Sequence, residues 1–130
     1  MKATELRVGN IVTVYDEPGR HDFVLVLEPG LVQLMGRPEP DDENNIIGVP
    51  LTAELLSQYA IPIGRTFSFG GEEILLEPSL GVDSGLLQVR RHRFSVRWMH
   101  ELQNILFCLC GRELVTHPHV HALQMGDLQP

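Results

Sequence analysis

Cysteine is nearly absent from this chain, which holds only Cys108 and Cys110 in 130 residues. On a helix, positions two apart point to roughly opposite sides, so these thiols are poorly placed for a mutual disulfide. We therefore expect reduced thiols and a cytoplasmic location. The sequence also lacks an apolar run of membrane-helix length, and residues 1–7 lack the apolar core of a signal peptide.

Aromatic and basic side chains are scarce as well. Aromatic residues make up 6% of the chain, so the core must rely on Leu, Val and Ile. Ten basic residues against 17 acidic ones give a net charge of −7, which disfavours broad contact with a phosphate backbone. The length leaves no room for two well-buried cores, so we predict a single domain over residues 1–115 and a tail over residues 116–130.

Apolar runs separated by Gly and Pro predict an antiparallel sheet in the first third of the chain. Residues 6–15 predict a strand interrupted by a Gly-Asn turn, and residues 23–27 and 31–35 predict a hairpin. Such short, bent strands favour a small curled sheet, and we consider an SH3-like partial barrel as its form. Residues 36–45, which contain two prolines and three consecutive acidic residues, predict a solvated surface loop.

Helix and strand patterns alternate in the rest of the chain. An apolar stripe over residues 51–59 predicts a short helix that Thr52 caps. Residues 66–96 predict an antiparallel meander, and residues 98–110 predict a longer helix that ends at Gly111. The expected fold is therefore α+β, a curled antiparallel sheet packed by a short middle helix and a longer C-terminal helix.

Three short motifs occur in the order and spacing found in one family. They are Glu-Leu-Arg-Val-Gly-Asn at 5–10, Val-Pro-Leu-Thr-Ala-Glu-Leu-Leu at 49–56, and the helical segment at 100–107 followed by Gly-Arg-Glu-Leu at 111–114. With these motifs the chain resembles a family of small bacterial and prophage-encoded proteins without assigned activity. The chain departs from that pattern at Leu55, where members usually carry an aromatic or longer residue, often Trp, and in its longer tail. The resemblance implies a fold and supplies no catalytic residues.

A histidine cluster in the tail is the first candidate for chemistry. Alternate residues of an extended segment project to the same side, so His117, His119 and His121 can converge on one Zn²⁺ or Ni²⁺ ion. No acidic general base stands beside them as in a metalloprotease helix. We expect adventitious metal binding by the tail and no resident cofactor.

An arginine cluster is the second candidate. It consists of Arg90, Arg91, Arg93 and Arg97, followed by Trp98. If residues 89–97 form one strand, Arg91, Arg93 and Arg97 share a face, where guanidinium groups bind carboxylates or phosphates. Three interpretations stay open. The arginines pair with acidic residues of the chain itself such as Glu72, they bind an acidic partner protein, or they bind nucleic acid with help from Trp98.

Conventional enzyme signatures are missing from the sequence. No serine stands in a nucleophile-elbow motif, and Gly70-Gly71 lacks the lysine of a phosphate-binding loop. We therefore predict a non-enzymatic binding or accessory module that acts through a partner protein or through self-association, with the arginine strand of one copy meeting the acidic loop of another. The second hypothesis is a small nucleic-acid-binding module that uses residues 90–97, and the third is a metal-dependent enzyme that uses the three histidines.

Overall fold

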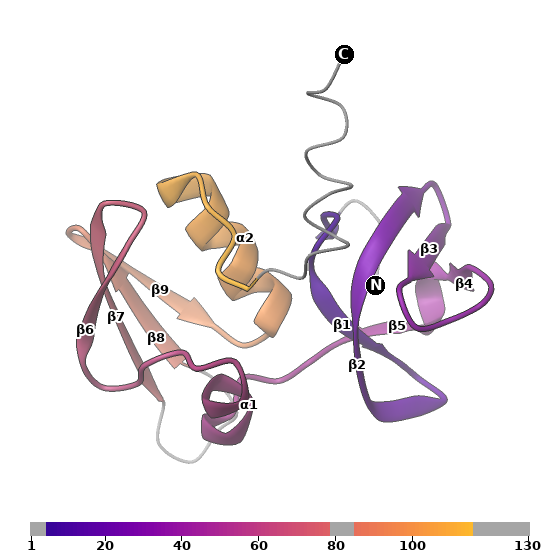
Figure 1. Cartoon of the computed structure of the whole chain (residues 1–130), viewed down its shortest axis with the longest axis horizontal. Helices are drawn as coiled ribbons and strands as arrows, with labels where there is room; N and C mark the ends of the chain where they lie inside the picture. Colours follow the sequence, from indigo (N-terminus) through magenta and orange to yellow (C-terminus); the bar gives the residue numbers. More distant parts are fainter. Residues whose placement is uncertain (1–4, 79–84, 116–130) are drawn as a thin grey trace. The chain divides into compact units, whose positions relative to one another are not determined.

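The computed structural model describes residues 5–78 and 85–115. The chain is α+β, with two antiparallel sheets and two α-helices among these residues, which confirms the predicted fold class (Figure 1). None of the helices in the described ranges is long and apolar enough to cross a membrane.

The chain divides into two compact units, one formed by the described residues up to Val49 with Val115, the other by Pro50–Leu114. Buried apolar side chains lie in both units. The assignment of residues 1–115 to a single domain stays a prediction.

The N-terminal unit is a five-stranded antiparallel sheet in the order β4-β3-β2-β1-β5. Its strands are β1 (Ile11–Val14), β2 (Glu17–Glu28), β3 (Leu31–Leu34), β4 (Asp41–Asp42) and β5 (Ile46–Gly48). The long β2 pairs with β1 through its first part and with β3 through its second, and the β2–β3 register shifts between Val24 and Val26. Such a shift bends a strand. The sheet is curled as predicted, and its described strands do not close into a barrel.

Glycines set the two turns that the sequence predicts in this unit. Gly30 has a φ of 81° and joins β2 to β3, where Glu28 pairs with Leu31. Gly9, with a φ of 96°, precedes β1, and the buried side chain of Asn10 accepts a hydrogen bond of 2.8 Å from the Arg7 N–H. The core beneath these strands is made of Leu6, Val12, Val14, Val24, Val32, Leu34 and Ile46.

The loop predicted over residues 36–45 holds regular structure in its second half. β4 pairs with β3 through Asp42 and Leu31, and a 3-10 turn over Glu43–Asn45 follows, capped by the Asp42 side chain. The prediction of a loop is wrong there, while Asp42, Asn44 and Asn45 are exposed as predicted. Arg37 anchors Asp41, whose side chain is only 10% exposed, and thereby fixes the backbone of the segment.

The C-terminal unit is a four-stranded antiparallel meander with two helices. Its elements are α1 (Ala53–Gln58), β6 (Thr66–Phe69), β7 (Glu72–Pro78), β8 (Gly85–Val89), β9 (His92–Val96) and α2 (Met99–Cys110). The strand order β6-β7-β8-β9 confirms the predicted meander. Thr52 caps α1 as predicted, since its hydroxyl accepts a hydrogen bond of 3.1 Å from the Leu55 N–H.

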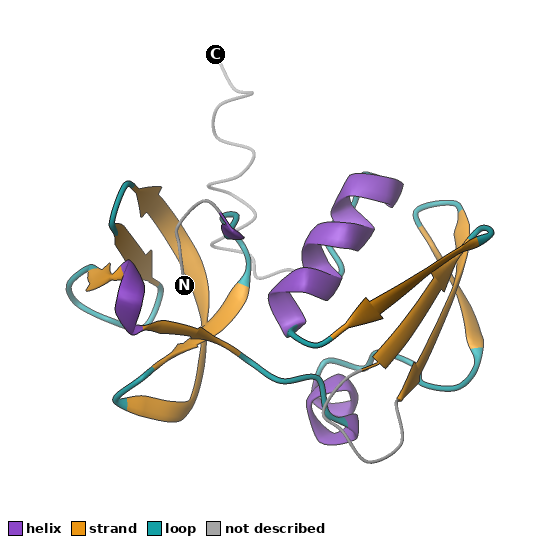
Figure 2. Cartoon of the chain, turned by 180° about the vertical axis from the view of Figure 1, so that it is seen from behind, coloured by secondary structure: helices purple, strands orange, loops and turns teal. Residues whose placement is uncertain are grey.

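α2 runs back along the sheet from the end of β9 (Figure 2). Its last turn lies against the turn between β6 and β7, where a Cβ added to Gly70 would stand 2.7 Å from the Cys110 Cβ. Gly111 ends the helix with a φ of 71°, as predicted. The apolar side chains buried in this unit are Leu51, Leu55, Leu56, Ile61, Ile74, Leu76, Leu87, Val89, Val96, Met99, Leu102 and Leu106.

Replacing Gly70 by Ala tests the contact between this turn and α2. Gly70 has a φ of 57°, and its new Cβ would also stand 2.8 Å from the Cys110 carbonyl oxygen. We expect Gly70→Ala to lower the free energy of unfolding by more than about 1 kcal/mol, measured by urea titration. Gly71→Ala is the matched control, because Gly71 has a φ of 81° but open space around its added Cβ. Equal losses for both variants would show that backbone strain alone matters there.

Candidate functional site

The arginine cluster lies on a hairpin. β8 ends at Val89, β9 begins at His92, and these two residues pair directly. Arg90 and Arg91 therefore form a two-residue turn, in which Arg90 has a positive φ of 59°. The hypothesis of one strand over residues 89–97 is wrong, because this turn reverses the chain after Val89.

Arg90 is held within the C-terminal unit. Its Nη2 lies 2.8 Å from Glu72 Oε1 on β7 and 3.5 Å from the carbonyl oxygen of Leu109 on α2. The hydrogen bond between Arg90 and Glu72 is the main cause that lowers the pKa of Glu72 and raises the pKa of Arg90. For this arginine, the interpretation of pairing within the chain is correct.

The other three arginines have exposed side chains. None of them forms an ion pair with another residue of the described ranges. Arg93 and Arg97 alternate with Ser95, so all three side chains share one side of β9 and its extension, while Arg91 stands at the turn. We call Arg91, Arg93, Ser95 and Arg97 the arginine face.

Trp98 borders the arginine face at the start of α2. The Cζ of Arg97 lies 5.1 Å from the centroid of the Trp98 ring, which is a cation–π distance. The N–H groups of Arg97 and Trp98 both donate to Glu101 Oε1, at 3.1 and 3.0 Å. Glu101 thus satisfies two donors at the helix start and fixes the backbone that carries Arg97.

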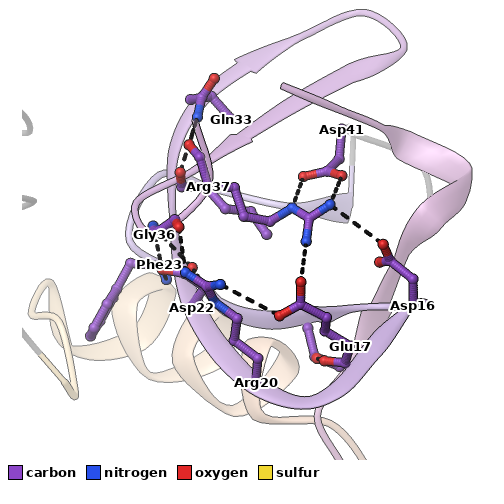
Figure 3. Close-up of polar contacts among 11 residues, drawn as sticks. Asp16, Glu17, Arg20, Asp22, Phe23, Gln33, Gly36, Arg37 and Asp41 are labelled. Atoms are coloured by element: carbon purple, nitrogen blue, oxygen red, sulfur yellow. Dashed lines mark hydrogen bonds and ion pairs between the residues drawn. The ribbon is translucent and has the colours of Figure 1, made fainter. Parts of the chain in front are cut away.

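A second polar cluster surrounds Arg37 in the N-terminal unit (Figure 3). The Arg37 guanidinium binds Asp41 in a bidentate way, with N–O distances of 2.8 and 2.9 Å. It also lies 3.1 Å from Glu17 and 3.7 Å from Asp16. The hydrogen bond to Asp41 is the main cause that raises the pKa of Arg37. The sequence contains no usable signal for this cluster, because the spacing of four between Arg37 and Asp41 indicates a contact only on a helix, and this segment is not helical.

Arg20 and Asp22 extend the same cluster. Asp22 is 7% exposed, and both of its carboxylate oxygens accept from the Gly36 N–H, at 3.0 and 2.9 Å. Arg20 donates to the Gly36 carbonyl oxygen and lies 3.5 Å from Asp22. These contacts tie the start of β2 to the segment after β3. The carboxylates of the cluster are therefore already engaged within the chain.

The histidine cluster at His117, His119 and His121 lies outside the described residues, so its metal binding stays a prediction. Within residues 5–78 and 85–115, no three His, Cys, Asp or Glu side chains are grouped so as to hold a metal ion. Cys108 and Cys110 are both free thiols. Burial, and after it the charge of Glu72, raises the pKa of the Cys110 thiol.

No family model, curated protein or solved structure matches this chain. The resemblance to small bacterial and prophage-encoded proteins therefore stays a prediction.

Replacing Glu72 by Gln is expected to remove a pH-dependent part of the stability. Because Arg90 lowers the pKa of folded Glu72 below its unfolded value, the stabilisation is present above the unfolded pKa. It is lost as the pH falls through the lowered, folded pKa. The difference in urea midpoint between the wild type and Glu72→Gln should therefore be larger at pH 7 than at pH 3. Glu73→Gln, on the exposed side of β7, is the control, and a Glu72 effect equal at both pH values would contradict this assignment.

The two cysteines are expected to react at different rates. The thiolate is the reactive species, and the raised pKa of the half-buried Cys110 reduces its thiolate fraction near neutral pH. In Cys108→Ser protein, iodoacetamide should modify the remaining thiol at least about fivefold more slowly than it modifies Cys110→Ser protein. Equal rates in the two variants would refute this expectation.

Proposed function

We propose that this chain is a non-enzymatic binding module that holds an acidic segment of a partner protein on its arginine face. One observation carries the proposal. Arg91, Arg93 and Arg97 are exposed and form no ion pair with the described residues, whereas Arg20, Arg37 and Arg90 all bind carboxylates of the chain. Uncompensated guanidinium groups at the surface attract carboxylates and orient them through paired hydrogen bonds.

The distribution of charge favours a protein partner over nucleic acid. Four of the ten basic residues fall within positions 90–97, while the chain as a whole carries a net charge of −7. Glu73 and Glu77 are also exposed and stand on the same side of the sheet as Arg93, two strands away. A phosphate backbone that crossed the sheet would meet these carboxylates, whereas a short acidic segment along β9 avoids them.

The acidic loop of a second copy is a weaker candidate for this partner. Asp41 is bound by Arg37 in two hydrogen bonds, and Asp42 caps the following turn by accepting from the Asn44 N–H at 2.8 Å. An arginine from another copy would have to displace these contacts. We therefore favour a separate cytoplasmic protein over self-association as the partner. We assign the module no resident cofactor. The metal-dependent enzyme stays a prediction.

Binding of a fluorescein-labelled peptide of alternating Glu and Val tests the proposal. At 50 mM salt, fluorescence anisotropy should show binding that weakens as salt is added. The double variant Arg93→Gln/Arg97→Gln should bind about threefold to tenfold more weakly, because two exposed charge pairs are lost. Arg112→Gln is the matched control, since Arg112 is also exposed but lies beyond α2.

Two outcomes would contradict the proposal. Unchanged affinity in the double variant would remove the arginine face from the site. Tighter binding of a single-stranded DNA 20-mer than of the peptide, with the same loss in the double variant, would replace the acidic protein by nucleic acid.

A further inference from the structure

β9 is an edge strand of the four-stranded sheet, so only one of its sides is paired by β8. In an antiparallel pair, opposite residues alternate between those that exchange hydrogen bonds and those that turn their backbone groups away. Val89 and His92 close a two-residue turn and therefore exchange hydrogen bonds. By alternation, Arg93 and Ser95 direct their N–H and C=O groups away from β8.

The backbone just beyond β9 confirms this alternation. Arg97, two residues after Ser95, uses its carbonyl oxygen to accept a hydrogen bond of 3.0 Å from the Leu51 N–H. Pro50 forms an antiparallel bridge with Trp98 beside it. An extended piece of the chain itself thus already pairs with this side of the edge. This piece turns into α1 after Thr52, which caps the helix. The backbone groups of Arg93 and Ser95 are therefore not paired by the described residues.

The charges along β9 select what can occupy this stretch. In a β9–β9 dimer centred on Ser95, Arg93 of one copy would stand opposite Arg97 of the other, and like charges directly opposite are destabilising. The other edge strand, β6, carries only Thr66 and Ser68 on the corresponding side and has no charge to select a ligand. Of the two edge strands of this sheet, β9 is therefore the one that combines backbone groups unpaired by the described residues with arginines.

We infer that an extended acidic segment of a partner protein adds to the sheet as a fifth strand beside β9. Its backbone pairs with Arg93 and Ser95. Of its carboxylates at alternate positions, one stands opposite Arg93, and the next, opposite Ser95, reaches Arg97 diagonally on the arginine face. This inference rests on the proposed function and adds its mode of recognition. The backbone supplies register, and the arginines select acidic residues spaced two apart.

Removing one outward N–H group separates strand addition from simple charge attraction. Ser95→Pro deletes the donor that points away from β8, at an edge position where proline is tolerated, and keeps every arginine. Ser95→Ala is the matched control, because it removes the hydroxyl and keeps the N–H. The hydrogen bonds can also be removed from the peptide. Two alternating Glu-Val peptides are prepared, one N-methylated at the Glu amides and the other at the Val amides, so that each lacks the donors of one edge of the strand.

The full-length protein is titrated with the labelled peptides at 50 mM salt, and thermal unfolding establishes that each variant is folded. We expect Ser95→Pro to bind the plain peptide at least about fivefold more weakly than the wild type, and Ser95→Ala to bind within about twofold. The wild type should lose a similar factor with the methylated peptide of one register. The amides of Arg93 and Ser95 should exchange more slowly with solvent in the complex.

The outcomes distinguish this inference from the proposed function. If Arg93→Gln/Arg97→Gln weakens binding but Ser95→Pro and both methylated peptides leave it unchanged, strand addition is overturned and the acidic-partner function survives. If the plain peptide does not bind the wild type, or if Arg93→Gln/Arg97→Gln binds it with unchanged affinity, both the proposed function and the strand addition are overturned. Should Ser95→Pro fail to fold, the methylated peptides on the wild-type protein decide the question.

Discussion

The position of the arginine face depends on how Arg90 is held. Arg90 occupies the first position of the β8–β9 turn, in a backbone conformation that residues with a Cβ rarely adopt, and its guanidinium binds both Glu72 and the last turn of α2. A two-residue turn admits only one strand register. That register decides which residues of β9 turn their backbone outward. The ion pair thereby links the packing of the helix to the chemistry of the sheet edge.

The arginines of the two clusters differ in whether their charge is paired within the chain. Arg37 is 18% exposed, and its guanidinium binds the carboxylates of Asp16, Glu17 and Asp41. It thereby joins two segments of the N-terminal sheet. Arg93 projects from an edge strand where the adjacent positions on the same side are Ser95 and Gln88 of β8. Its surroundings contain no carboxylate directly opposite, and its charge remains available at the surface.

The sequence predicted the regular elements well and the site only in part. Apolar periodicity and the glycines at 9, 30 and 111 were sufficient for the hairpin, the meander and α2, because each signal is local. The meander implied a reversal between residues 89 and 94, but its two-residue turn at Arg90 was not located, because no glycine or asparagine marks it and Arg90 contacts Glu72, which is distant in the sequence. The engagement of Asp41 was missed because a spacing of four predicts a side-chain contact only on a helix, whereas Arg37 and Asp41 lie in a non-helical segment. Whether a charge is free is decided by tertiary neighbours, which composition does not reveal.

Pro50 limits the length of any strand that can add beside β9. Its antiparallel bridge to Trp98, next to the Leu51–Arg97 hydrogen bond, fills the far end of that edge, and α1 begins three residues later. A newcomer has room only between the hairpin tip and this obstruction, a stretch of about five residues or roughly 17 Å. Under the proposed strand addition, this edge takes a short linear motif, and the added strand cannot be continued past the Pro50–Trp98 bridge.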